Sequence, residues 1–424
     1  MERTSTVYQT YIEILRRELV PAMGCTEPIA VAFCAAKARQ VLGEMPERIL
    51  IQASGNIIKN VKSVIVPHTG GLRGLEAAAA VGTFYGNADA GLEVVSSVTG
   101  EQASALAERM QTVGIEVTPL ASEHILDLVI TETVADRSVS VRITDEHTNI
   151  TEIKENGKTL YSCAASASAE ETELDYDALN MTDIFDFAST AVLADVSEIL
   201  ERQIAYNTAI SKEGLTNHYG ARIGQLLLKR DNNVRTRAKA YAAAGSDARM
   251  SGCDMPVIIN SGSGNQGMTA SLPVIAYAEH YGKSREALLR ALLISNLTTL
   301  HLKSGIGRLS AYCGAVSAGA GAGAGIAYLL TGDLRVINHT IVNCLAVSSG
   351  IVCDGAKASC AAKIAMAVDA GIMGYDMYMN GCQFYSGDGL VSKGVENTIR
   401  NISQLGNEGM KETDKKIIEI MTSC

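Results

Sequence analysis

The sequence predicts an α+β fold, with a mixed N-terminal domain containing antiparallel strands and a largely all-helical domain after it. Apolar residues recur at helical spacing near the N-terminus, as Tyr8, Ile12 and Leu15 do. Strand-like alternation, as in Val139, Val141 and Ile143, is confined to roughly the first 165 residues, and long apolar segments rich in Ala and Gly follow. We therefore expect a mixed domain at 1–168, an acidic linker at 169–177 and a helical domain at 178–424.

The elements expected in the first domain alternate between helices and strands. Helices are predicted at 7–20, 28–42, 75–81 and 101–113, and strands at 48–52, 63–66, 115–120, 126–132, 138–144 and 149–155. In the second domain, helices are predicted at 184–205, 220–244, 272–281, 285–300, 314–330, 335–347 and 358–368. The repeated Gly and Ala residues from Gly319 to Gly325 allow helices to approach closely.

The composition bounds the class of protein. With 424 residues, 47% of them hydrophobic and 19% charged, the chain is globular rather than disordered. A net charge of −10, the lack of a Lys/Arg cluster and the absence of Trp argue against a nucleic-acid partner. The N-terminus lacks the basic and then apolar order of a signal peptide, so we expect a cytoplasmic protein with reduced cysteines. Whether it forms a homo-oligomer is left open.

Two uncharged segments, 255–278 and 309–332, are long enough to span a bilayer. The first has a polar stretch in its middle, and the second is mostly Gly and Ala, which drive membrane insertion poorly. We therefore expect no membrane partner and interpret both as buried parts of a soluble core. A membrane channel or transporter is the alternative.

The segment Gly24-Cys25-Thr26-Glu27-Pro28 stands at the start of an apolar helix. Because Thr26 can cap this helix and Pro tolerates its first turn, Cys25 is expected at or just outside the helix N-terminus. The positive end of the helix dipole is expected to lower the pKa of its thiol, which favours a base, a nucleophile or a metal ligand. The alternative is a helix start that merely contains a cysteine.

A glycine-rich loop, Asn260-Ser-Gly-Ser-Gly-Asn-Gln-Gly267, precedes another apolar helix. Its N–H groups and polar side chains suit a small carboxylate or phosphate, although a polar connector has the same composition. The candidate substrate-binding residues are Asn260, Ser261, Ser263, Asn265 and Gln266. Just before this loop, Asp247 and Arg249 interrupt apolar sequence, and we expect them to be paired or hydrogen-bonded structural charges.

Cys313, Cys353 and Cys360 lie in apolar, Gly/Ala-rich surroundings. Reduced thiols commonly bind metals, and three that converge can hold an iron–sulfur cluster, whereas isolated ones are ordinary small hydrophobic residues. On one continuous helix, Cys353 and Cys360 would be roughly 10.5 Å apart along the axis. If both are ligands, Asp354-Gly355 must therefore break the helix.

Together, Gly24–Pro28, Ser246–Arg249, Asn260–Gly267, Arg308-Leu-Ser-Ala-Tyr-Cys313 and Cys353–Cys360 resemble the L-cysteine desulfidase family of bacteria and archaea, relatives of the iron–sulfur L-serine dehydratases. The resemblance implies a [4Fe–4S] cluster on Cys313, Cys353 and Cys360, with Cys25 as the base and no pyridoxal phosphate. It implies α,β-elimination of L-cysteine to pyruvate, ammonia and hydrogen sulfide.

Three alternatives stay open beside this reading. L-serine dehydration uses the same machinery, and a small-molecule binding protein without a cluster belongs to a different class altogether. Cys25 itself, or the C-terminal Cys424, could also reach the open iron, although a frayed terminus is the simpler expectation for Cys424.

Overall fold

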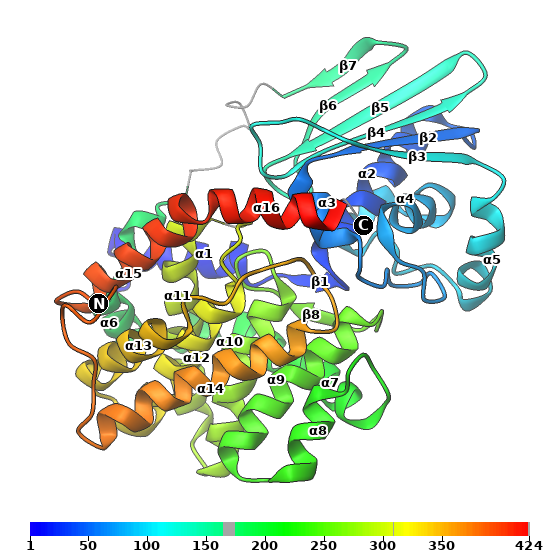
Figure 1. Ribbon diagram of the computed structural model, residues 1–424. Helices are drawn as coiled ribbons and strands as arrows, with labels where there is room; N and C mark the ends of the chain where they lie inside the picture. The colour runs from blue at the N-terminus through cyan, green and yellow to red at the C-terminus, as the bar shows by residue number, and fades with distance from the viewer. Residues whose placement is uncertain (164–173, 308, 423–424) are drawn as a thin grey trace.

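The computed structural model describes residues 1–163, 174–307 and 309–422, so Cys424 lies outside the described residues. It confirms the predicted α+β class, with a sheet-containing part and a larger helical part (Figure 1). The sheet has the strand order β3-β2-β4-β5-β6-β7, in which β2 and β3 are parallel and the other neighbours antiparallel. Its strands are β2 (Arg48–Ala53), β3 (Gly114–Pro119), β4 (Asp127–Val134), β5 (Arg137–Thr144), β6 (Ile150–Glu155) and β7 (Lys158–Ser162).

Helices α2 (Thr26–Leu42) and α4 (Gly74–Tyr85) cover one face of this sheet. The predicted alternation is confirmed, because Val139, Val141 and Ile143 all point into the buried core beneath these helices. The same part contains α3 (Gly55–Val61), α5 (Gly100–Met110) and a short 3-10 helix at Ala88–Glu93. Since α2 begins at the boundary with the helical part, its first residues are placed where the two parts meet.

The helical part is built around α12 (Gly314–Thr331). Its neighbours are α10 (Gly264–His280), α11 (Arg285–Ile306), α13 (Leu334–Ser348) and α14 (Cys360–Met379). Farther out lie α6 (Met181–Thr190), α7 (Ser197–Thr216), α8 (Ile223–Arg230), α9 (Val234–Met250) and α15 (Val395–Gln404). Glycines let α12 pack closely on two sides, as expected: Gly319 and Gly323 face the α14 backbone, and Gly321 and Gly325 face α11.

In length and composition, α12 could cross a membrane, yet 78% of it is buried inside the protein. It is the central core helix, as interpreted from the sequence. The other uncharged segment, 255–278, is not one helix, because strand β8 (Pro256–Ile258) and a loop precede α10 within it.

The chain crosses between the two parts more than once. Helix α1 (Thr6–Glu18) packs in the core of the helical part through Tyr8 and Tyr11. Strand β1 (Pro21–Met23) then pairs with β8, directly before α2 begins. At the other end of the chain, α16 (Lys411–Thr422) lies along α3 (Figure 1), and its Asp414 accepts a 2.5 Å hydrogen bond from the buried Lys59.

Several predicted elements are wrong in detail. The predicted strand at 63–66 is not a strand, because α3 takes up the preceding residues and only an isolated bridge joins Ile65 to Arg73. The predicted helix at 184–205 is two helices, α6 and α7. The Tyr8 hydroxyl bonds to Asp195 and Val192 in the turn between them. The predicted helix at 220–244 is likewise α8 and α9, and the exposed strand β7 was not expected.

Candidate active site between the two parts

A short antiparallel contact brings two of the predicted metal ligands together. Tyr312 pairs with Val352 as an isolated bridge. On either side of it, the Cys313 N–H donates to Ile351 O at 3.1 Å, and the Cys353 N–H donates to Ala311 O at 2.6 Å. Cys313 and Cys353 each follow a residue of this bridge, so they lie close together in space although they are 40 positions apart in the sequence.

Cys360 lies near Cys313 and Cys353 because the chain between Cys353 and Cys360 is not a continuous helix, as the spacing of two ligands required. Helix α14 begins only at Cys360. Gly355 has a φ of +89°, which L side chains rarely adopt. A Cβ at this position would lie 2.2 Å from the Lys59 carbonyl oxygen, so the turn also packs tightly against α3. The predicted break at Asp354-Gly355 is therefore confirmed.

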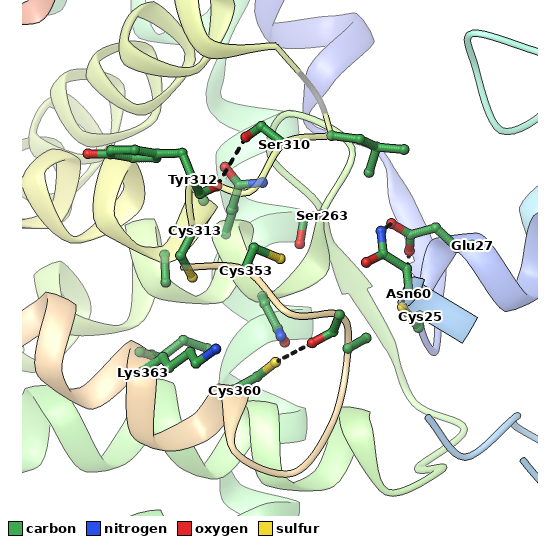
Figure 2. A pocket seen from close by; sticks show the side chains of 18 of the residues that line it. Cys25, Glu27, Asn60, Ser263, Ser310, Tyr312, Cys313, Cys353, Cys360 and Lys363 are labelled. Atoms are coloured by element: carbon green, nitrogen blue, oxygen red, sulfur yellow. Dashed lines mark hydrogen bonds between the residues drawn. The ribbon is translucent and has the colours of Figure 1, made fainter. Parts of the chain in front are cut away.

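One cavity of about 110 Å³ gathers these cysteines and Cys25. Its lining includes Cys25, Glu27, Asn60, Arg249, Ser263, Asn265, Gln266, Lys303, Cys313, Cys353, Cys360 and Lys363. Figure 2 shows Cys25, Glu27 and Asn60 on one side and the three cysteines on the other, with Ser263 between them. We call the first side the α2 wall and the second the cysteine wall.

On the α2 wall, Cys25 is the N-cap residue of α2, as predicted. Its thiol donates to a carboxylate oxygen of Glu27 at 3.1 Å, and Asn60 donates to the other oxygen at 3.0 Å. Thr26 does not cap the helix, contrary to the prediction, because its hydroxyl bonds to Glu27 and to Gly262 O instead. Glu27 is thus a buried carboxylate held by three side-chain donors.

The expected lowering of the Cys25 pKa is wrong. Burial raises the pKa of Cys25 well above its ordinary value, and the nearby Glu27 carboxylate raises it further. Burial also acts to raise the pKa of Glu27, but His147 and the hydrogen bond from Cys25 oppose it and leave that pKa below its ordinary value. The helix dipole is outweighed, so Cys25 holds its proton and shares it with an ionised Glu27.

On the cysteine wall, two lysines lie near the thiols. Lys303 is 3% exposed, and burial lowers its pKa to about 8 although Cys353 and Cys313 oppose that shift. Its ammonium donates to Gly307 O at 2.6 Å. Lys363 donates to Val352 O at 2.9 Å and pairs with Asp354. These cations favour negative charge on the sulfur atoms.

The donor set fits the iron–sulfur cluster that the resemblance implies. The three thiols are free, and Cys313 and Cys360 stand at the N-terminal ends of α12 and α14. Burial raises the pKa of Cys313 to about 12 and also raises the pKa of Cys360, so these thiols would lose their protons on binding iron. Among the described residues, no three His, Cys, Asp or Glu side chains are grouped closely enough to hold a single metal ion. A cluster of four irons spreads its ligands more widely than one ion, so the wider arrangement is compatible with it.

The five predicted substrate-binding residues do not all line the same cavity. Ser263, Asn265 and Gln266 line the cavity at the start of α10. Asn260 does not, because its amide is buried against Asn296, to which it donates at 3.0 Å. Ser261 lines a separate, neighbouring cavity.

The Ser246–Arg249 motif is also divided. Asp247 is fully buried and accepts the Gly224 N–H at 3.1 Å, which caps the start of α8, so its structural role is confirmed. Arg249 lines the cavity instead, and no ion pair joins it to Asp247 or to another residue in the described part of the chain. The two charges do not pair with each other: Asp247 is hydrogen-bonded, as expected, whereas Arg249 has no hydrogen-bond partner among the described residues.

Sequence reasoning missed Glu27, Asn60, Arg249, Lys303 and Lys363 as residues of the site. Glu27 had a usable signal, since it lies two residues from Cys25 at the start of the same apolar helix. Asn60 and the lysines carry no local signal, because only tertiary contacts bring them to the cavity.

Comparisons with known proteins agree with this geometry. The model of the serine dehydratase alpha chain family matches residues 89–419, which include the three cysteines of the cysteine wall and the loop before α10 but not Cys25. A UPF0597 protein of Desulfitobacterium hafniense is 55% identical over 99% of this chain and 98% of its own length. UPF0597 proteins of Finegoldia magna and Treponema denticola are 48% and 44% identical over 97% and 99% of this chain, and 99% of their own lengths.

The match to this family model, over most of the chain, defines a protein of the serine dehydratase alpha chain type, and the predicted relation to these enzymes is confirmed at the level of the family. The chain belongs to the serine dehydratase alpha chain family and, within it, to the UPF0597 proteins.

Proposed function

We propose that this protein is an iron–sulfur-dependent L-cysteine desulfidase, which converts L-cysteine and water to pyruvate, ammonia and hydrogen sulfide. The observation that carries the proposal is the single cavity in which three free thiols face the Cys25–Glu27 pair. Membership of the serine dehydratase family supports the reaction class, a lyase acting on a small amino acid. L-serine dehydration is the second candidate, supported by the membership of the serine dehydratase alpha chain family.

Cys313, Cys353 and Cys360 would hold a [4Fe–4S] cluster. When bound, it would supply a Lewis-acidic iron without a protein thiolate, able to polarise the β-substituent of the substrate. Lys303 and Lys363 would offset the negative charge of the thiolates. The cysteine wall would thus assist departure of the leaving group, and the α2 wall on the other side of the cavity would remove the proton.

The α2 wall would move the proton. Cys25 Sγ takes the proton from the substrate Cα as its own thiol proton passes to Glu27 along the 3.1 Å hydrogen bond. Asn60 and Thr26 hold the Glu27 carboxylate in place for this transfer. The electron pair left at Cα then expels the β-substituent, and the resulting enamine hydrolyses to pyruvate and ammonia.

Sulfide from cysteine and hydroxide from serine would be eliminated by the same steps. The residues of the site therefore identify the type of reaction, but they discriminate less well between the two substrates. The preference for cysteine rests on soft sulfur matching a thiophilic iron. Oxygen in serine is a harder donor and a poorer match.

The test is pyruvate release from L-cysteine and from L-serine by protein purified and reconstituted with iron and sulfide without oxygen. We expect pyruvate from both, with a higher kcat/KM for L-cysteine and sulfide formed in equal amount to pyruvate. The same protein without iron is the control and should release none. Pyruvate from serine alone would replace the desulfidase by the dehydratase. No pyruvate from either substrate would remove the lyase and leave a binding protein.

A further inference from the structure

Arg249 is a buried cation that the proposed proton transfer and metal site do not use. It is 1% exposed and ranks first in size among the fully buried side chains. Its Nε has no hydrogen-bond partner, and no ion pair or hydrogen bond joins its guanidinium to any residue that the structure describes. Burying a charge in this way is costly unless a counter-charge accompanies it. The side chain lines the cavity, so a ligand there can supply that charge.

The start of α10 adds a second positive pole at the same point. A Cβ built on Gly264, the first residue of this 17-residue helix, would lie 2.5 Å from Arg249 Nε. The N–H groups of a helix's first turn have no partner within the helix, and the N-cap residue Ser263 makes no capping hydrogen bond to them. A guanidinium and a helix N-terminus repel each other, and an anion that contacts both would stabilise the arrangement.

The nearest carboxylate of the cavity does not fill this role. Glu27 influences Arg249 electrostatically but forms no ion pair with it. Its two oxygens already accept from Cys25, Thr26 and Asn60. Since no carboxylate in the described parts of the chain pairs with Arg249, we take its counter-charge to be a ligand bound in the cavity.

We propose that Arg249 and the first turn of α10 bind the α-carboxylate of the amino-acid substrate. The identity of that substrate rests on the proposed elimination reaction. A planar guanidinium can hold a carboxylate through two parallel hydrogen bonds, which fixes its orientation as well as its position. Gly264 leaves the space for this approach, since any side chain there would displace Arg249 or Val257.

This carboxylate-binding site, which we call the anchor, fixes the orientation of the substrate in the cavity. Arg249 and Cys25 line the same cavity, so a carboxylate bound by the guanidinium would lie beside the base, with the Cα proton directed to the thiol. The β-substituent then points across the cavity to the cysteine wall. Removal of the Cα proton also places negative charge on the carboxylate, so the same guanidinium stabilises the transition state more than the bound substrate.

Binding of a substrate-shaped molecule that cannot eliminate tests the anchor directly. L-Alanine keeps the carboxylate and ammonium groups but has no leaving group, and L-alaninamide replaces the carboxylate by a neutral amide. Titration calorimetry on the iron-reconstituted protein should give binding of L-alanine and at least tenfold weaker binding of L-alaninamide. Equal affinity for the two molecules overturns the proposal, and this comparison needs no variant.

Two variants and a matched control complete the experiment. Arg249→Gln should weaken L-alanine binding about tenfold to a hundredfold, as expected for loss of a charge-assisted pair. Arg249→Lys, which keeps the charge but not the two-bond geometry, should fall between. Arg237→Gln removes a guanidinium on the same helix that bonds to His280 at the surface, and it should bind like the parent protein. L-Alanine binding unchanged in Arg249→Gln overturns the anchor.

Turnover separates this inference from the proposed function. Arg249→Gln should raise the KM for L-cysteine and lower kcat, because it acts on both the bound substrate and the transition state. If the parent protein binds L-alanine through Arg249 but releases no pyruvate, carboxylate binding by Arg249 is supported and the proposed lyase activity is contradicted. If Arg249→Gln releases pyruvate with the kcat and KM of the parent protein, the lyase activity is supported and carboxylate binding by Arg249 is contradicted.

Discussion

The two walls of the cavity satisfy their side chains in different ways. On the α2 wall, a network of side-chain hydrogen bonds surrounds Glu27, with Cys25 and Asn60 as donors. On the cysteine wall, backbone pairing and turn geometry place the thiols. Among the described residues, the one side-chain contact of these three thiols is a weak one, from Cys360 Sγ to Gly355 O at 3.7 Å. In the proposed function the first wall holds and moves a proton, whereas the second presents soft ligands beside lysines. Substitutions on the two walls should therefore have separable effects.

The largest expected effect is on the cysteine wall. Cys353→Ser should lose the cluster and the activity together, because a hydroxyl is a poor iron ligand beside two thiolates. Iron content and visible absorption after anaerobic reconstitution measure the cluster. Cys382→Ser, at an exposed cysteine away from the cavity, is the control and should keep both. Full iron content in Cys353→Ser would remove Cys353 from the ligand set.

A substitution on the α2 wall should separate chemistry from metal binding. Cys25→Ala should keep the cluster but lower kcat by about 10²- to 10⁴-fold, the usual contribution of a positioned acid–base group. The measurement is pyruvate release at matched iron content. Parental turnover in this variant would place the base elsewhere, and loss of iron would make Cys25 a ligand.

The contact between the walls gives the third prediction. Gly355→Ala should lower both the melting temperature and the iron content, because its Cβ meets the Lys59 carbonyl oxygen in a backbone conformation that costs about 1–2 kcal/mol for L residues. Gly381→Ala is a matched control, since Gly381 has a φ of +76° but no atom within 4 Å of its Cβ position. The iron content should fall only in Gly355→Ala, and equal iron in both would mean that the contact is irrelevant to the metal site.

The smallest effect concerns α9, which supplies Arg249 to the cavity and Asp247 to the fold. Burial raises the pKa of Asp247 to about 6, so the folded protein binds this proton more tightly than the unfolded chain does. The stability that this proton gives is complete below about pH 4 and is lost as the pH rises through about 6. Asp247→Asn keeps a cap for α8 without this loss. Its melting temperature relative to the parent should rise between pH 4 and pH 7, and a constant difference would contradict the assignment.

Periodicity was enough to predict the fold class and most helices, because the core helices present long apolar faces. It could not locate breaks that tertiary contacts impose. Tyr8 fixes the turn between α6 and α7 from 184 residues away along the chain. Every residue of strand β7 is exposed, so its sequence lacks the alternation of apolar and polar residues from which a strand is predicted.

The site was only partly predictable for a related reason. The required break at Gly355 followed from helix geometry, but convergence of the cysteines was implied by the family resemblance rather than by their spacing. The helix dipole predicted a lowered Cys25 pKa, whereas burial and Glu27 decide it. Arg249 looked like a structural charge in sequence because its surroundings are apolar, and only the cavity distinguishes it from Asp247.

The most direct test of the central claim is the Mössbauer spectrum of protein reconstituted with ⁵⁷Fe, recorded with and without L-serine or L-cysteine. Three thiolates on one wall predict one iron of the four that differs from the others, and only its signal should shift when substrate is added. Four irons that respond alike to substrate, or no cluster in protein that remains folded, would contradict the account.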